Sequence, residues 1–146
     1  MINPTPHRGS YRGITIVALL SACGGGAEPA TTNDAPRMRP AEQGASSAVY
    51  FTLRNPGPEP LVLYDAEIDV AGNTMIHRSV EQNGMSSMSR EDSVIVPPGQ
   101  AVRFAERGLH LMATGLRAAL SPGDTVVVRL LFRPARVDTV RVPVIE

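Results

Sequence analysis

The chain has 146 residues, of which 42% are hydrophobic and 4% aromatic, with 14 basic and 14 acidic side chains. Every basic side chain is an arginine, because the sequence contains no lysine. The absence of lysine excludes mechanisms that depend on a P-loop lysine or on a lysine Schiff base. The balanced charge, without a clustered basic face, gives no indication of a nucleic-acid partner.

The first 22 residues have the pattern of an export signal. Arg8 and Arg12 precede the short apolar run 13–20, which ends just before Cys23. A lasting transmembrane helix needs about 20 apolar residues. We therefore expect residues 1–22 to be a cleavable signal peptide rather than a membrane anchor.

The end of this signal, Leu20-Ser21-Ala22-Cys23, resembles the lipobox of bacterial lipoproteins, in which the cysteine is acylated and the chain is cut just before it. Cys23 is the only cysteine of the chain. Its acyl chains would hold the protein at a membrane surface. Gly24 after the cysteine resembles lipoproteins that are sorted to the outer membrane. The alternative is a chance cysteine beside an ordinary signal peptide.

Residues 23–42 are rich in Gly, Ala, Thr and Pro and have no apolar periodicity, which predicts a flexible tether. Residues 43–146 then form a single domain with a modest core. Removal of the signal leaves twelve arginines against fourteen acidic residues, a net charge of about −2. With Cys23 acylated, the folded domain has no thiol, so neither a disulfide nor a thiolate metal site can form in it.

Short runs of Val, Leu, Ile and Phe, separated by Pro and Gly, predict an all-β fold. Strands at this spacing favour a two-sheet sandwich, with an edge strand at Pro143 because proline cannot donate to a ladder. We expect the segment 125–133 to be the longest. The expected strands are 48–53, 61–64, 66–70, 94–96, 101–104, 109–113, 125–133 and 140–144.

Asn83-Gly84 is a strong hairpin signal, because both residues tolerate the positive φ of a type I′ turn. His77 and Met88 then lie on one face as a diagonal pair, with Cα atoms about 7–8 Å apart. Met75, which shares that face, and Met85 are candidate accessory ligands, but Met85 lies on the other face and ranks below Met88. The predicted pairs are Gln82 with Met85, Ser79 with Met88, and His77 with Arg90.

His110 and Met112 are two residues apart on an expected strand, so they project from one face. The intervening face would supply the core side chains Leu109, Leu111 and Ala113. Beside the hairpin, this pair could supply two further ligands.

The set His77, Met88, His110 and Met112 combines imidazole nitrogen with thioether sulfur, and it contains both histidines of the mature domain. Thioethers are soft ligands that suit Cu(I) better than zinc, calcium or magnesium. Taken singly, a methionine on a strand is more often core filler and a lone histidine more often an ordinary surface residue. The copper hypothesis depends on the four together.

The spacing H-x10-M-x21-H-x-M, from His77 to Met112, resembles the signature of the periplasmic copper chaperones of the PCuAC type. Four longer segments, 48–55, 95–99, 108–116 and 120–132, also resemble segments of this family. The resemblance implies a cupredoxin-like Greek-key β-sandwich that binds Cu(I) and passes it to another protein. In that family the recipient is typically the dinuclear copper site of cytochrome c oxidase, sometimes together with a Sco-type thiol protein.

Two other functions compete with a periplasm-facing, lipid-anchored copper chaperone. One is a metal-free lipoprotein interaction domain with an immunoglobulin-like sandwich, which would be favoured if His77 and His110 lay at opposite poles. The other is an enzyme, but the sequence contains no H-E-x-x-H, G-x-S-x-G or phosphate-cradling motif. We therefore expect a protein without catalytic activity.

Overall fold

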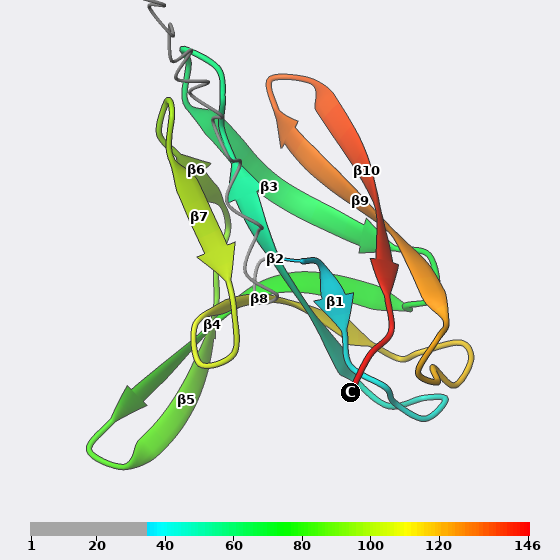
Figure 1. The fold of residues 1–146 in the computed structure, drawn as a ribbon. Helices are drawn as coiled ribbons and strands as arrows, with labels where there is room; N and C mark the ends of the chain where they lie inside the picture. Colours follow the sequence, from blue (N-terminus) through cyan, green and yellow to red (C-terminus); the bar gives the residue numbers. More distant parts are fainter. Residues whose placement is uncertain (1–34) are drawn as a thin grey trace, which may run out of the picture.

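In a computed structural model, which describes residues 35–146, the chain forms two β-sheets (Figure 1). The expected signal peptide and Cys23 lie outside the described residues. No helix within residues 35–146 is long and apolar enough to cross a membrane. The strands are β1 (Arg37–Met38), β2 (Ser47–Arg54), β3 (Leu61–Ile68), β4 (Asn73–Gln82), β5 (Met85–Arg90), β6 (Val94–Val96), β7 (Ala101–Phe104), β8 (Leu109–Thr114), β9 (Thr125–Arg133) and β10 (Arg136–Pro143).

The larger sheet has the strand order β1-β2-β7-β8-β4-β5, with an additional pairing between β2 and β8. The smaller sheet has the order β10-β9-β3-β6. Each strand of the smaller sheet is antiparallel to its neighbours, as are most strands of the larger one. The two-sheet, all-β architecture expected from the sequence is confirmed.

The core lies between the two sheets and is built by side chains that alternate along each strand. In β9 the buried positions are Val126, Val128, Leu130 and Phe132, and the residues between them are exposed or half-buried. This period of two is what a strand with one face on the core requires. In the larger sheet, the rings of Phe51 and Phe104 stack with their centroids 4.4 Å apart.

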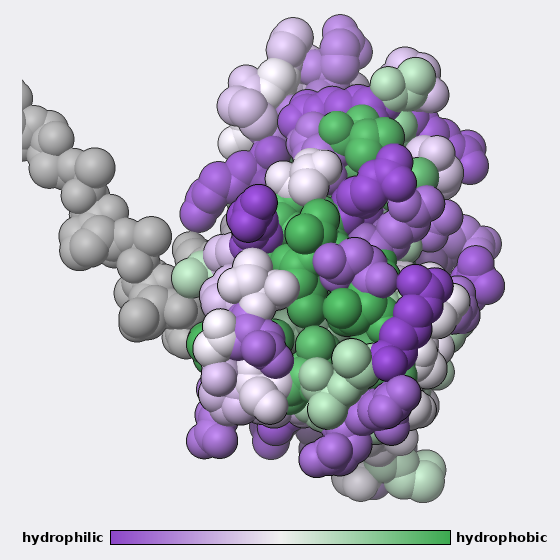
Figure 2. Space-filling view, turned by 90° about the vertical axis from the view of Figure 1, so that its right-hand side faces the viewer, coloured by the Kyte–Doolittle hydropathy of each residue, from purple (hydrophilic) through white to green (hydrophobic). Residues whose placement is uncertain are grey.

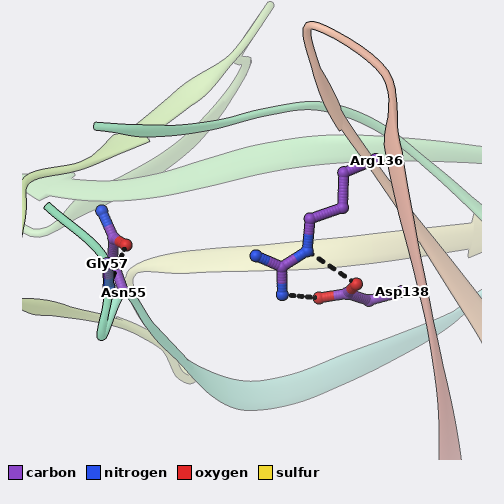
Figure 3. Close-up of polar contacts among 4 residues, drawn as sticks. All are labelled: Asn55, Gly57, Arg136 and Asp138. Carbon is purple, nitrogen blue, oxygen red and sulfur yellow. Dashed lines mark hydrogen bonds and ion pairs between the residues drawn. The ribbon is translucent and has the colours of Figure 1, made fainter. Parts of the chain in front are cut away.

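The strand β10 is the edge of the smaller sheet, as Pro143 indicated. On this side of the molecule, Figure 2 shows hydrophobic side chains gathered in the middle of the face and framed by hydrophilic ones. Near the start of β10, the Arg136 guanidinium donates two hydrogen bonds to the Asp138 carboxylate (Figure 3). A small apolar hollow between β2, β9 and β10 is lined by Val49, Phe51, Val128, Leu130, Val140 and Val142.

Asn55 fixes the turn that follows β2 and is one of the few buried polar residues. Its side-chain amide donates to the carbonyls of Glu59 at 2.7 Å and Val96 at 2.9 Å. Its carbonyl oxygen accepts a hydrogen bond from the Gly57 N–H at 3.1 Å (Figure 3). Because these partners satisfy the amide, its burial joins the turn to β6 without an unpaired polar atom.

Two expectations about strand lengths were wrong. The segments expected as separate strands at 61–64 and 66–70 form the single strand β3, whose pairing with β9 shifts between Leu63 and Asp65. The irregularity lets the Asp65 carboxylate accept the Ala66 N–H at 2.8 Å. The longest strand is β4 rather than 125–133, because β4 continues past the sandwich into a hairpin.

The segment 37–41, which the sequence assigned to the tether, is part of the folded domain. β1 pairs with β2, and the Met38 side chain is completely buried. Ala41 exchanges backbone hydrogen bonds with Leu120. A single apolar residue among Arg and Pro has no periodicity, so composition alone did not indicate that Met38 belongs to the core.

The β4–β5 hairpin extends away from the two packed sheets (Figure 1). All six residues of β5 are exposed. The first half of β4 pairs with β8, and its second half pairs with β5. One strand therefore connects the packed sandwich to a solvent-exposed arm.

Candidate metal centre

The pairing of β4 with β8 brings both histidines together. His77 lies directly opposite His110, and Met75 lies directly opposite Met112. The two imidazole rings have centroids 5.9 Å apart and meet nearly at right angles, with an interplanar angle of 83°. The histidines are thus neighbours on one sheet and do not lie at opposite poles, the arrangement that would have favoured the metal-free alternative.

Alternation along the two strands places this cluster on the outer face of the larger sheet. Ile76 and Leu111 point inward and are buried in the core, whereas His77 and Met112 are half-buried on the other side. The expectation that Leu109, Leu111 and Ala113 supply the core is confirmed.

The β4–β5 hairpin has the register that Asn83-Gly84 predicted. Both turn residues have positive φ, 54° for Asn83 and 74° for Gly84. Met88 lies opposite Ser79 and so shares the face of His77, with 58% of its surface exposed. Met85 lies opposite Gln82 on the other face and is 72% exposed. Met85 therefore does not face the histidines.

His110 is 4% exposed, and its ring has one hydrogen-bond partner. Its Nδ1 lies 3.0 Å from the carbonyl oxygen of Gly108, which also accepts the Ser79 N–H. Since a carbonyl only accepts, Nδ1 carries the proton in this bond, and Nε2 keeps its lone pair. Histidines that bind a metal through one ring nitrogen typically donate the N–H of the other to a carbonyl in this way.

The Nδ1 atom of His77, unlike that of His110, is buried without a hydrogen-bond partner. Leaving a buried polar atom unpaired costs about 1–3 kcal/mol. The pKa of His77 is lowered from 6.5, first by burial of the ring, then by electrostatic interaction with His110 and with Arg90. The lowered pKa favours the neutral imidazole, which is the form that binds metals.

The chemistry of the donors fits a soft metal ion. In the part of the chain that the structure describes, no three side chains of His, Cys, Asp and Glu gather closely enough to hold a metal. The cluster instead combines two imidazoles with neutral thioethers, which suits a d10 ion such as Cu(I). Met112 and Met75 are half-buried while Met88 is exposed, so the cluster is packed on one side and open on the other.

Sequence reasoning missed the side chains that surround this cluster. The Tyr50 ring lies beside His110 with centroids 6.4 Å apart, and the Arg37 guanidinium lies 5.0 Å from the centroid of the Tyr50 ring. Alternation in 48–53 does place Tyr50 on the outer face, but nothing in the sequence indicates that β2 pairs with β8.

One surface hollow borders the cluster, and another lies apart from it. One of about 370 Å³ borders it and is lined by Arg39, Pro40, Ser46, Ser47, Ala48, Tyr50 and Met112. A larger one of about 460 Å³ lies along β3 and the start of β4, where Asp69 and Arg117 are among its lining residues. None of the candidate ligands lines the larger hollow.

The fold and the cluster define a small β-sandwich with an outward-facing His/Met site. The family model described as "Putative lipoprotein LpqE-like" matches residues 31–144. The chain belongs to this LpqE-like family.

One curated relative is named "Putative lipoprotein Lxx21020" and comes from Leifsonia xyli subsp. xyli (strain CTCB07). It is 29% identical to this chain over 99 residues. The match covers 67% of this chain and 60% of the relative, so the chain spans less than two thirds of the relative's length.

Solved PCuAC domains have the same fold. The apo PCuAC domain from PmoF1 has a TM-score of 0.63 at 19% identity, covering 77% of this chain and 91% of that domain. The copper-bound PCuAC domain from PmoF2 has a TM-score of 0.62 at 21% identity, covering 76% and 88%. The solution structure of CuI-DR1885 from Deinococcus radiodurans has a TM-score of 0.59 at 25% identity, covering 84% of each chain. The expected cupredoxin-like fold of the PCuAC type is confirmed.

Proposed function

We propose that this protein is a Cu(I)-binding metallochaperone with the ligand set His77, Met88, His110 and Met112. The observation that carries the proposal is the pair of directly opposed histidines, one with an orphaned buried Nδ1, flanked by thioethers on the outer face of a sheet. The names of two structural neighbours, "copper-bound" and "CuI", support copper as the cargo.

Transfer of the ion would proceed by ligand exchange. Thioethers bind Cu(I) without losing a proton, and the histidines bind once their imidazoles are neutral. The lowered pKa of His77 keeps its imidazole neutral to lower pH than usual. The exposed Met88 is the donor that a recipient reaches first, whereas His110 holds the ion from the packed sheet.

The chaperone would act from a membrane surface. The family description and the name of the curated relative both contain the word lipoprotein, which supports acylation at Cys23 after removal of residues 1–22. We propose a cell-envelope location facing the periplasm, with the outer membrane as the anchoring membrane. The proposed recipient is the copper site of cytochrome c oxidase or a Sco-type protein, and no catalytic step is proposed.

Copper titration tests the ligand set. The full chain carrying Cys23→Ser, in which no thiol competes, would be titrated with Cu(I) against a chromophoric chelator under reducing conditions. We expect one equivalent to bind, and we expect Met88→Leu and Met112→Leu to weaken binding. Met85→Leu is the matched control, since Met85 faces away from the histidines. If Met88→Leu and Met112→Leu bind as tightly as this control, the ligand assignment is wrong.

A further inference from the structure

We propose that Met75 is a fifth copper ligand, which with Met112 and the two histidines holds Cu(I) when Met88 is withdrawn. This inference rests on the proposed function. It adds a donor that lies outside the H-x10-M-x21-H-x-M spacing. The site then has two overlapping donor sets that share His77, His110 and Met112 and differ in Met75 or Met88.

The position of Met75 makes an inner set of four donors on two adjacent strands. Met75 lies opposite Met112 and His77 lies opposite His110, so the set consists of two directly opposed pairs. Directly opposed Cβ atoms in an antiparallel sheet are about 4.5–5.5 Å apart, and diagonal neighbours about 7–8 Å. Side chains as long as Met and His can close such gaps around one ion.

Met88 approaches the histidines from the other side. It pairs with Ser79, two positions beyond His77 in the direction away from Met75. The histidine pair therefore lies between Met88 on one side and the pair Met75–Met112 on the other. Either Met88 or Met75 can therefore complete the coordination of an ion that His77, His110 and Met112 hold.

Burial separates the two sides further. Met75 and Met112 are half-buried, whereas Met88 lies on the exposed edge strand β5. Met75 also does not fill the core. It lies outside the buried core cluster, to which β4 contributes Ile76. Its place beside Met112 on the outer face leaves metal binding as the role that its chemistry supports.

Exchange between the two sets balances without redox chemistry. The bond from the Met88 sulfur to Cu(I) would break and the Met75 sulfur would bind in its place, so the number of bonds to the ion is unchanged until a donor of the recipient displaces a ligand of the inner set. Both sulfurs are neutral, so no proton or electron moves and the ion remains Cu(I). The inner set would keep the ion from escaping into solvent between release by Met88 and capture by the recipient.

Methyl NMR combined with titration tests this inference. The full chain with Cys23→Ser, labelled at the methionine ε-methyl groups, would be loaded with Cu(I) in the parent and in Met88→Leu. We expect the Met75 and Met112 methyl resonances to shift in Met88→Leu, while those of Met85 and the buried Met38 do not. Loss of a group that merely supports a ligand costs about 10–100-fold in metal affinity. We therefore expect Met75→Leu in the Met88→Leu background to lower the affinity at least about tenfold.

The controls distinguish this inference from the proposed function. Met85→Leu in the Met88→Leu background should leave the affinity unchanged, and Met75→Leu alone should have a small effect because Met88 remains. If Cu(I) binds and shifts the Met112 methyl group but not that of Met75, and the two double variants bind equally, the inference is wrong and the proposed function stands. If the parent chain binds no Cu(I), both are wrong.

Discussion

The two flanks of β4 differ in almost every property that matters for a metal site. On the β8 side, His77 faces the buried His110, whose Nδ1 is tied to a backbone carbonyl. On the β5 side, the same strand faces a row of exposed residues that includes Met88. One strand thus divides the proposed ligands into a packed half that can hold an ion and an open half that can release it.

The largest contrast expected between the flanks is in stability. Leu111 is completely buried behind His110, and removing such a side chain costs about 2–5 kcal/mol in the free energy of unfolding. Val80 is an exposed residue of the arm, so Val80→Ala should change that free energy by less than about 0.5 kcal/mol. Urea denaturation of Leu111→Ala and Val80→Ala measures both. Equal effects would show that the arm is as tightly packed as the sandwich.

The next largest effect is expected on copper affinity at the packed flank. His110→Ala removes a proposed ligand that the sheet holds in place, and we expect the Cu(I) affinity to fall at least about 100-fold, or about 2.8 kcal/mol. Competition titration against a Cu(I) chelator measures this loss. Ser79→Ala, on the same face but without a donor for Cu(I), is the control. If His110→Ala loses no more Cu(I) affinity than this control, the histidine pair does not bind the ion.

A smaller effect is expected from the turn of the arm. Gly84 has a φ of +74°, and a Cβ there would meet no atom within 4 Å, so an Ala suffers from backbone strain alone. We expect Gly84→Ala to cost about 1–2 kcal/mol and to weaken copper binding no more than Met88→Leu does. Gly84→Asn should be milder, because Asn adopts this conformation more readily. Denaturation and Cu(I) titration of the two variants measure these effects. A larger loss of stability for Gly84→Asn than for Gly84→Ala would contradict the expected order.

The smallest effect is a pH dependence at His77. Its pKa is lowered in the folded protein, so between that value and 6.5 the unfolded chain binds more protons. The stability of the metal-free protein should therefore be highest above 6.5 and fall as the pH drops through the lowered pKa. Cu(I) affinity should fall in the same direction as protons compete for the ring. Unfolding at several pH values, with His77→Gln as the control, should show this slope only where the histidine is present.

How much of each flank the sequence predicts depends on how far apart in the chain the interacting residues lie. The β4–β5 register was predictable because a two-residue Asn-Gly turn locks the pairing of the residues beside it. The pairing of Met75 with Met112 was not predictable, because these two residues lie on strands β4 and β8 and are more than thirty positions apart in the chain. Likewise Met38 joins the core through a two-residue strand whose local pattern resembles a linker.

The central claim is that His77 and His110, with neighbouring thioethers, bind one Cu(I). X-ray absorption at the copper edge, on the one-to-one complex of the full chain carrying Cys23→Ser, tests it most directly. The account predicts a Cu(I) edge with both imidazole nitrogen and thioether sulfur in the coordination shell, and loss of the imidazole signal in the double variant His77→Ala/His110→Ala. A shell without sulfur, or an unchanged spectrum in the double variant, would contradict the claim.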